Sequence, residues 1–177
     1  MDDLTQLIIL AQDGDRDAYG KIYSIFYKRI YRYCLFNTRS VELAADICQD
    51  TFIKAWRALP TFSIKKGGSM QAFLFRIARN LIIDVSRKKK TEPLENYENL
   101  PSGEDLEAGV DRRDENRKLV RALSRLDEVD RQIVMLSYFE ELSGAEIAKV
   151  VKIREGALRV RMHRALKKLK DLMEQND

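Results

Sequence analysis

The sequence predicts an all-α protein with two small helical domains, a four-helix N-terminal bundle and a C-terminal helix-turn-helix domain, joined by a flexible acidic linker. Three observations lead to this prediction. Glycine and proline are scarce, with 8 and 3 among 177 residues, which disfavours a turn-rich sandwich or barrel. Apolar residues recur with the period of a helix through most of the chain. One acidic stretch with few branched apolar residues separates two basic stretches.

The acidic stretch sets the expected domain boundaries. The formal net charge is +7 over residues 1–90, −7 over 91–116 and +4 over 117–177. The acidic part holds two of the three prolines and cannot bury a core, so it is expected to form a linker at 91–114 that leads to a second domain at 115–177. Two basic domains suit a polyanionic partner, but charged helices also need solvated faces, and charge alone does not decide between these readings.

Four helices are expected in the first domain. Apolar stripes with helical period cover residues 4–11, 18–33, 44–59 and 70–85, and they predict four helices whose stripes meet in a bundle core. The segment from Pro60 to Ser69 is polar and basic, and it predicts a loop between the third and fourth helices.

Shorter helices are expected in the second domain. Two of them span about 115–124 and 128–139. Ser143 followed by Glu146 is a capping box, which marks the start of a short third helix. The last helix is expected at about 154–174.

The last two helices have the spacing of a helix-turn-helix. Counted from Gly144, the fifth residue is the small Ala148, where the helices cross closely, and the fifteenth is Leu158, which ties the second helix to the core. The ninth, Lys152, departs from the usual glycine, because the turn there often needs a positive φ. Arg154 also stands where a serine or threonine N-cap would be expected.

Two helices carry polar stripes suited to nucleic acid. The arginines of the last helix cannot all lie in a core, and arginine binds guanine edges or phosphates. The fourth helix of the first domain has a stripe of arginine and asparagine that suits base edges, followed by a basic run that suits phosphates. Its members are Arg76, Arg79, Asn80, Asp84 and Arg87. For Asp84, pairing with a neighbouring cation is an open alternative.

The third helix carries a different face. Asp46, Gln49 and Asp50 lie opposite Phe52. An acidic and amide face in a basic domain does not suit DNA, and it predicts a protein partner with a basic helix.

With these motifs, the chain resembles the bacterial RNA polymerase sigma factors of the extracytoplasmic-function (ECF) type, in the sigma-70 family. The resemblance covers both domains and depends on the order and spacing of the motifs. They are the run Ala45 to Arg57, the run Phe73 to Asn80 with Asp84 and Arg87, the triplet Glu146 to Ala148, and the run Arg161 to Ala165.

The resemblance implies that the chain directs core RNA polymerase to specific promoters and helps to melt the DNA. Residues 1–90 would be sigma region 2 and residues 115–177 sigma region 4. The implied polymerase-docking residues are Asp46, Gln49, Asp50 and Phe52. The implied contacts to the downstream (minus-ten) promoter element are Lys54, Arg57, Phe62, Arg76, Arg79, Asn80, Asp84, Arg87 and Lys88. The implied contacts to the upstream (minus-thirty-five) element are Arg154, Gly156, Ala157, Arg159, Val160, Arg161, His163 and Arg164.

Other partners and one departure also follow from the resemblance. The loop from Pro60 to Ser69 matches a base-capturing loop of the family, and the acidic linker matches the segment that threads toward the RNA exit path. Many members are held by an anti-sigma factor, which is therefore a further expected partner. The family pattern Thr-Val-Lys-Ser-Arg reads Ala157 to Arg161 here, which removes a hydroxyl contact to phosphate at position 157.

Two alternative functions are weighed against this one. A helix-turn-helix regulator that acts without polymerase would leave the face of Asp46 and Phe52 unused. A helical nuclease or phosphatase would need a catalytic cluster, yet the single histidine, His163, lies in the expected recognition helix, and only Asp46 and Asp50 are spaced to hold a metal. We therefore expect neither catalysis nor a cofactor.

Composition also predicts where the protein acts. No stretch approaches the roughly 18 apolar residues of a membrane span, so we expect no membrane insertion. The acidic N-terminus does not fit a secretory signal, and the expected location is cytoplasmic. Two cysteines cannot form a disulfide framework, so Cys34 and Cys48 are interpreted as small apolar residues, with a redox or metal role as the minor alternative.

Overall fold

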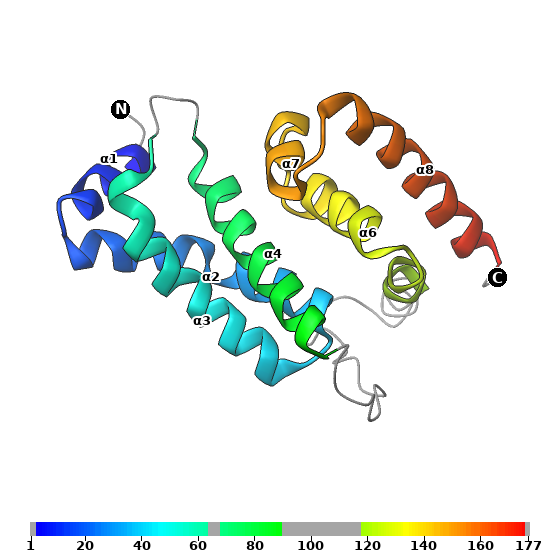
Figure 1. Cartoon of the computed structure of the whole chain (residues 1–177), viewed down its shortest axis with the longest axis horizontal. Coiled ribbons are helices and arrows are strands. Elements are labelled where there is room, and N and C mark those ends of the chain that lie inside the picture. The colour runs from blue at the N-terminus through cyan, green and yellow to red at the C-terminus, as the bar shows by residue number, and fades with distance from the viewer. Residues whose placement is uncertain (1–2, 64–67, 90–117, 176–177) are drawn as a thin grey trace, which may run out of the picture. The chain divides into compact units, whose positions relative to one another are not determined.

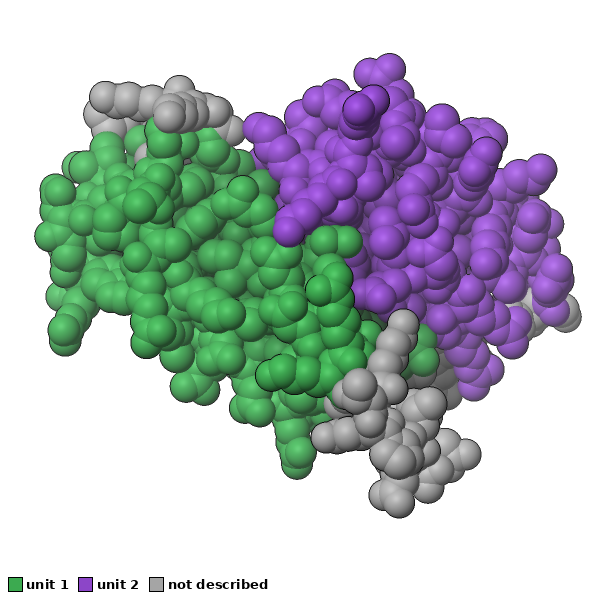
Figure 2. Space-filling model, in the orientation of Figure 1, with its two compact units in different colours: residues 1–99 green, residues 100–177 purple. Residues whose placement is uncertain are grey.

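The computed structural model describes residues 3–63, 68–89 and 118–175, and its regular elements there are all helical (Figure 1). The all-α prediction is thus confirmed. The chain divides into two compact units, residues 1–99 and 100–177 (Figure 2). The expected linker at 91–114 lies outside the described residues.

Unit 1 contains the four predicted helices. They are α1 (Asp3–Gln12), α2 (Arg16–Thr38), α3 (Val41–Ala58) and α4 (Met70–Lys89), with a short 3₁₀ turn at Leu59–Thr61 after α3. The longest of them, α2, packs against the other three (Figure 1). Side chains that are fully buried along it include Ile22, Ile30 and Tyr33, and the Tyr33 ring meets Phe75 of α4 edge-on at 5.1 Å between centroids.

Polar residues start the helices of unit 1. The Asp15 carboxylate accepts hydrogen bonds from the backbone N–H groups of Asp17 and Ala18, and so caps α2. The Ser40 hydroxyl caps α3 in the same way, by accepting from the N–H of Leu43. These caps satisfy N–H groups that have no partner inside the helix.

The two cysteines lie in the core between α2 and α3. Both are free and buried. Burial raises the pKa of the Cys48 thiol to about 11 and also raises that of Cys34, so both thiols stay neutral and pack as small apolar side chains.

Unit 2 is built from shorter helices. Residues 118–124 are helical, α6 spans Glu128–Val134 and continues into one π-helical turn at Met135–Phe139, α7 spans Gly144–Val151 and α8 spans Glu155–Glu174. The expected single helix at 128–139 therefore changes its winding near residue 135. There the backbone N–H of Glu140 bonds to the carbonyl of Met135, five residues back.

The helix-turn-helix geometry is present in unit 2. Ser143 and Glu146 form the predicted capping box of α7. Ala148 and Leu158 are both buried, and a Cβ added to Gly144 would lie 3.7 Å from the Leu158 side chain. Lys152 takes the left-handed conformation (φ 59°, ψ 47°) that the turn requires, although it is not glycine.

Candidate nucleic-acid and partner interfaces

One side of α8 is buried and the other side is exposed. Leu158 and Ala165, seven residues apart, are buried and fix which way the helix faces. Seven of the predicted upstream contact residues are exposed: Arg154, Gly156, Ala157, Arg159, Val160, His163 and Arg164. Arg154 gives no side-chain cap to α8. The exposed cations give this side of α8 a surface suited to phosphates.

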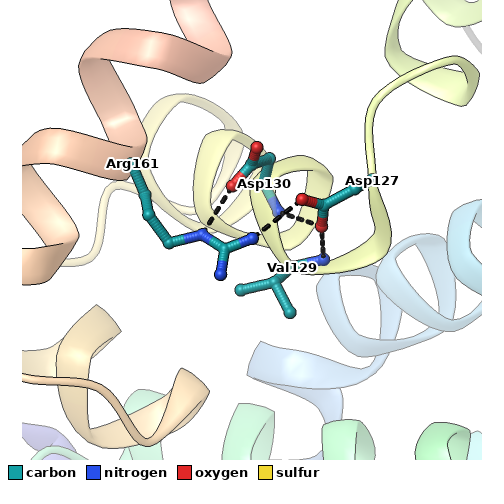
Figure 3. A network of polar contacts seen from close by, with 4 residues as sticks. All are labelled: Asp127, Val129, Asp130 and Arg161. Atoms are coloured by element: carbon teal, nitrogen blue, oxygen red, sulfur yellow. Dashed lines mark hydrogen bonds and ion pairs between the residues drawn. The ribbon is translucent and has the colours of Figure 1, made fainter.

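The Arg161 side chain on α8 points to two carboxylates, those of Asp127 and Asp130 (Figure 3). Its Nε donates to Asp130 Oδ1 at 2.7 Å, and its Nη2 donates to Asp127 Oδ2 at 2.8 Å. The sequence predicted a side chain directed at DNA, whereas the guanidinium is held by two carboxylates at the start of α6. We call Arg161, Asp127 and Asp130 the α6–α8 clamp.

The electrostatics of the clamp are those of a charge-assisted pair. The hydrogen bond to Asp130 is the main cause that raises the pKa of Arg161. Partial burial alone would raise the pKa of Asp127, but hydrogen bonds from the backbone N–H groups of Asp130 and Val129, with the Arg161 charge, hold it below its usual value. Asp127 therefore caps α6 and binds Arg161 at once, and both groups stay ionised at neutral pH.

The polar stripe on α4 is largely exposed. Arg76, Asp84, Arg87 and Lys88 are exposed and Asn80 is half-buried, while Lys54 and Arg57 are exposed on α3. The Arg76 guanidinium lies over the Phe73 ring, 5.7 Å from its centroid. Arg79 differs from the stripe predicted by the sequence, because it is only 7% exposed. Its position follows from its spacing, since it lies four residues after the buried Phe75 and three before the buried Ile82.

The described ends of the predicted base-capturing loop are held by contacts that the sequence did not suggest. The Gln12 side-chain amide of α1 donates to the carbonyl groups of Leu59 (3.0 Å) and Phe62 (2.7 Å). The Phe62 ring packs on Phe73 of α4 at 4.9 Å between centroids. A Cβ on Gly68 would lie 2.5 Å from the Ser63 carbonyl oxygen and 3.1 Å from the Phe62 ring, so only glycine fits there. Residues 64–67 lie outside the described part of the chain.

The predicted docking face on α3 divides into exposed and buried members. Asp46, Gln49 and Asp50 are exposed, as expected. Phe52 is only 4% exposed and packs beneath the Tyr23 ring of α2, 4.6 Å away between centroids. It supports the face from inside and does not itself lie on the surface.

Aromatic residues of α2 extend along the junction with α3. The rings of Tyr23 and Tyr27 stack at 5.1 Å, and those of Tyr27 and Tyr31 stack at 6.0 Å. Tyr19 packs on Trp56 at 4.8 Å and its hydroxyl donates to the Phe52 carbonyl. These tyrosines recur every four residues, so the sequence alone could have placed them on one face of α2. The spacing does not show that the tyrosine rings remain partly exposed.

Other kinds of site are absent from the described residues. No group of three or more His, Cys, Asp and Glu side chains there could hold a metal ion. None of the helices in that part of the chain is both long enough and apolar enough to cross a membrane.

Comparisons with known proteins agree with the two-unit arrangement. Residues 22–92 match the family model for sigma-70 region 2, and residues 116–169 match the model for sigma-70 region 4. The ECF RNA polymerase sigma factor SigW of Bacillus subtilis (strain 168) is 33% identical, over 90% of this chain and 92% of SigW. The chain belongs to the ECF family of RNA polymerase sigma factors. It directs RNA polymerase to promoters in transcription initiation, and its partners are core RNA polymerase and promoter DNA.

Further relatives fit this assignment. The ECF sigma factor BldN of Streptomyces coelicolor is 32% identical over 96% of the chain, which spans 66% of BldN. The fold is that of CnrH, solved in complex with the cytosolic domain of CnrY, with a TM-score of 0.76 at 24% identity over 99% of this chain and 100% of CnrH. The sigma factor RpoE of Bartonella quintana, solved with the anti-sigma factor NepR, has a TM-score of 0.74 at 20% identity over 88% of this chain and 96% of RpoE.

Proposed function

We propose that this sigma factor divides its work between three surfaces. The exposed acidic and amide residues of α3 dock on core polymerase, the polar stripe of α4 with Phe62 acts on the downstream promoter element, and the exposed side of α8 reads the upstream element. The observation that carries this proposal is the separation of charge within unit 1, where Asp46, Gln49 and Asp50 are exposed on α3 while α4 exposes cations. An acidic face repels DNA and suits a basic protein surface.

Melting follows from the capture of bases that unstack. Unstacking costs a few kcal/mol per base, and aromatic and amide side chains offset this cost by binding the exposed base. Phe62 and Asn80 are half-buried side chains of the kinds that can do so. The two readers act together on one promoter because both are bound to the same polymerase, so neither needs high affinity alone.

The docking assignment is tested by charge reversal. Asp46→Lys with Gln49→Lys should abolish co-purification with core polymerase while the far-ultraviolet circular dichroism stays helical, because both side chains are exposed. Asp84→Lys is the control, an exposed acid on α4 that should leave polymerase binding intact. Normal polymerase binding by the double variant would contradict the assignment.

An anti-sigma factor is a further proposed partner, and its support comes from the solved complexes of CnrH with CnrY and of RpoE with NepR. Such a protein would compete with core polymerase for binding to the full chain, and a candidate protein that fails to compete would not be its anti-sigma factor.

We also propose that the chain acts in the cytoplasm, together with RNA polymerase, and that it catalyses no reaction. A metal-dependent nuclease assay on the purified chain tests the last point.

A further inference from the structure

An apolar side chain lies at the centre of the exposed side of α8. Val160 is 50% exposed. At 100° per residue it points about 200° away from the buried Leu158, which is almost the opposite direction. An exposed valine in a helix interior gains no free energy from burial, and valine has a lower helix propensity than the adjacent arginines, Arg159 and Arg161.

The surroundings of Val160 leave room for a close approach. Gly156, one turn earlier on the same side, has no side chain, and apart from its two chain neighbours and the nearby backbone of α8 no atom lies within 4 Å of the point where its Cβ would be. Arg164, one turn later, and Arg159 are exposed cations. The patch is therefore a small apolar knob flanked by arginines, beside a position where the backbone is uncovered.

This combination matches one chemical feature of duplex DNA. Arginines on either side bind phosphates or guanine edges. Valine can form no hydrogen bond with a base, so it can contribute only an apolar contact. In the major groove, the C5-methyl group of thymine is the apolar group that the base edges present.

We propose that Val160 contacts the C5-methyl group of one thymine in the upstream promoter element and sets the preference for thymine there. This inference rests on the proposed role of α8 and adds the base and the atom that are read. A thymine-to-uracil replacement removes that methyl group and leaves every hydrogen-bonding group of the base unchanged.

The test uses the full chain bound to core polymerase. Promoters with a randomised upstream element and a constant downstream element are selected for binding, and each thymine of the selected element is then replaced by deoxyuridine, one at a time. For the unaltered protein we expect one replacement to weaken binding by about three- to tenfold, as for loss of one buried methyl group. With Val160→Ala the same replacement should have little effect.

A matched control is available in unit 1. Val41 is 52% exposed at the start of α3, and Val41→Ala should keep the full response to deoxyuridine. If no uracil replacement weakens binding of the unaltered protein, or if Val160→Ala responds as strongly as Val41→Ala, the assignment of Val160 is wrong while the role of α8 stands. If the holoenzyme selects no upstream sequence at all, the role proposed for α8 fails together with that of Val160.

Discussion

The α6–α8 clamp gives a prediction that separates a structural arginine from a DNA-binding one. Arg161→Gln removes both hydrogen bonds, to Asp130 at 2.7 Å and to Asp127 at 2.8 Å. The Asp130 side chain is 18% exposed, that of Asp127 53% and that of Arg161 37%, so the first bond is better shielded than the second. Shielded charge-assisted bonds contribute about 1.5–3 kcal/mol and exposed pairs about 0–1, so the partly exposed clamp should contribute about 1–2 kcal/mol.

The assay is native-state hydrogen exchange on the full chain, which reports stability at each amide. Arg161→Gln should lower protection in α6 and α8 by about 1–2 kcal/mol and leave α2 and α3 unchanged. Arg161→Gln with Asp130→Asn should recover part of the loss, because the better shielded of the two carboxylates is then no longer left charged without Arg161.

DNA binding supplies the second half of the test. The Arg161 guanidinium is held by Asp130 and Asp127, so we expect it to make no phosphate contact. The slope of log affinity against log salt counts phosphate contacts, and it should therefore stay the same in the double variant. The matched control is Arg164→Gln, an exposed arginine on α8, which should leave protection unchanged and reduce that slope by about one. The reasoning is refuted if Arg161→Gln leaves protection in α8 intact, or if the double variant lowers the slope as Arg164→Gln does.

Three further predictions follow from the described residues. The pKa of Asp127 is lower in the folded chain than in the unfolded chain, where it is about 4, so the ionised carboxylate stabilises unit 2 fully above about pH 4. This stabilisation is lost as the pH falls through the folded-state pKa. In acid-unfolding curves below about pH 4, the wild-type chain should therefore lose more stability in unit 2 than Asp127→Asn, which keeps a capping side chain. Lys152→Gly should raise the unfolding free energy of unit 2 by about 0.5–1 kcal/mol, since the left-handed backbone costs a non-glycine residue more than glycine loses in chain entropy; equal stability in urea unfolding would contradict it. Gly68→Ala should lower the unfolding free energy of unit 1 by about 1–3 kcal/mol, because the new Cβ would collide with the Ser63 carbonyl oxygen. The same variant should reduce promoter opening, measured by the permanganate reactivity of thymines. Gly20→Ala is the control: it has open space around it and should stabilise α2.

Local signals explain what could be predicted from the sequence. The capping box of Ser143 and Glu146 marked the start of α7 because its two partners are three residues apart. The pairing of Arg161 with Asp130 joins residues 31 positions apart and depends on how α6 crosses α8, which no local pattern records. Gln12 was missed for the same reason, since its acceptors lie 47 and 50 residues away. Phe52 was placed in the docking face by the resemblance, although it is buried and packs on Tyr23 of α2, 29 positions earlier in the chain.

Val160 and Arg161 show why residue type alone does not identify a DNA contact on α8. Adjacent residues in a helix point 100° apart, so two buried anchors, Leu158 and Ala165, decide the direction of every side chain between them. With that phase fixed, the apolar Val160 points outward, and the cationic Arg161 points to the carboxylates of α6 (Figure 3). The resemblance implied an upstream contact for both residues, and the direction of each side chain favours Val160 over Arg161 for the proposed contact. In the role proposed for α8, specificity would therefore depend on the buried residues that set the phase of the helix as much as on the exposed residues that face the DNA.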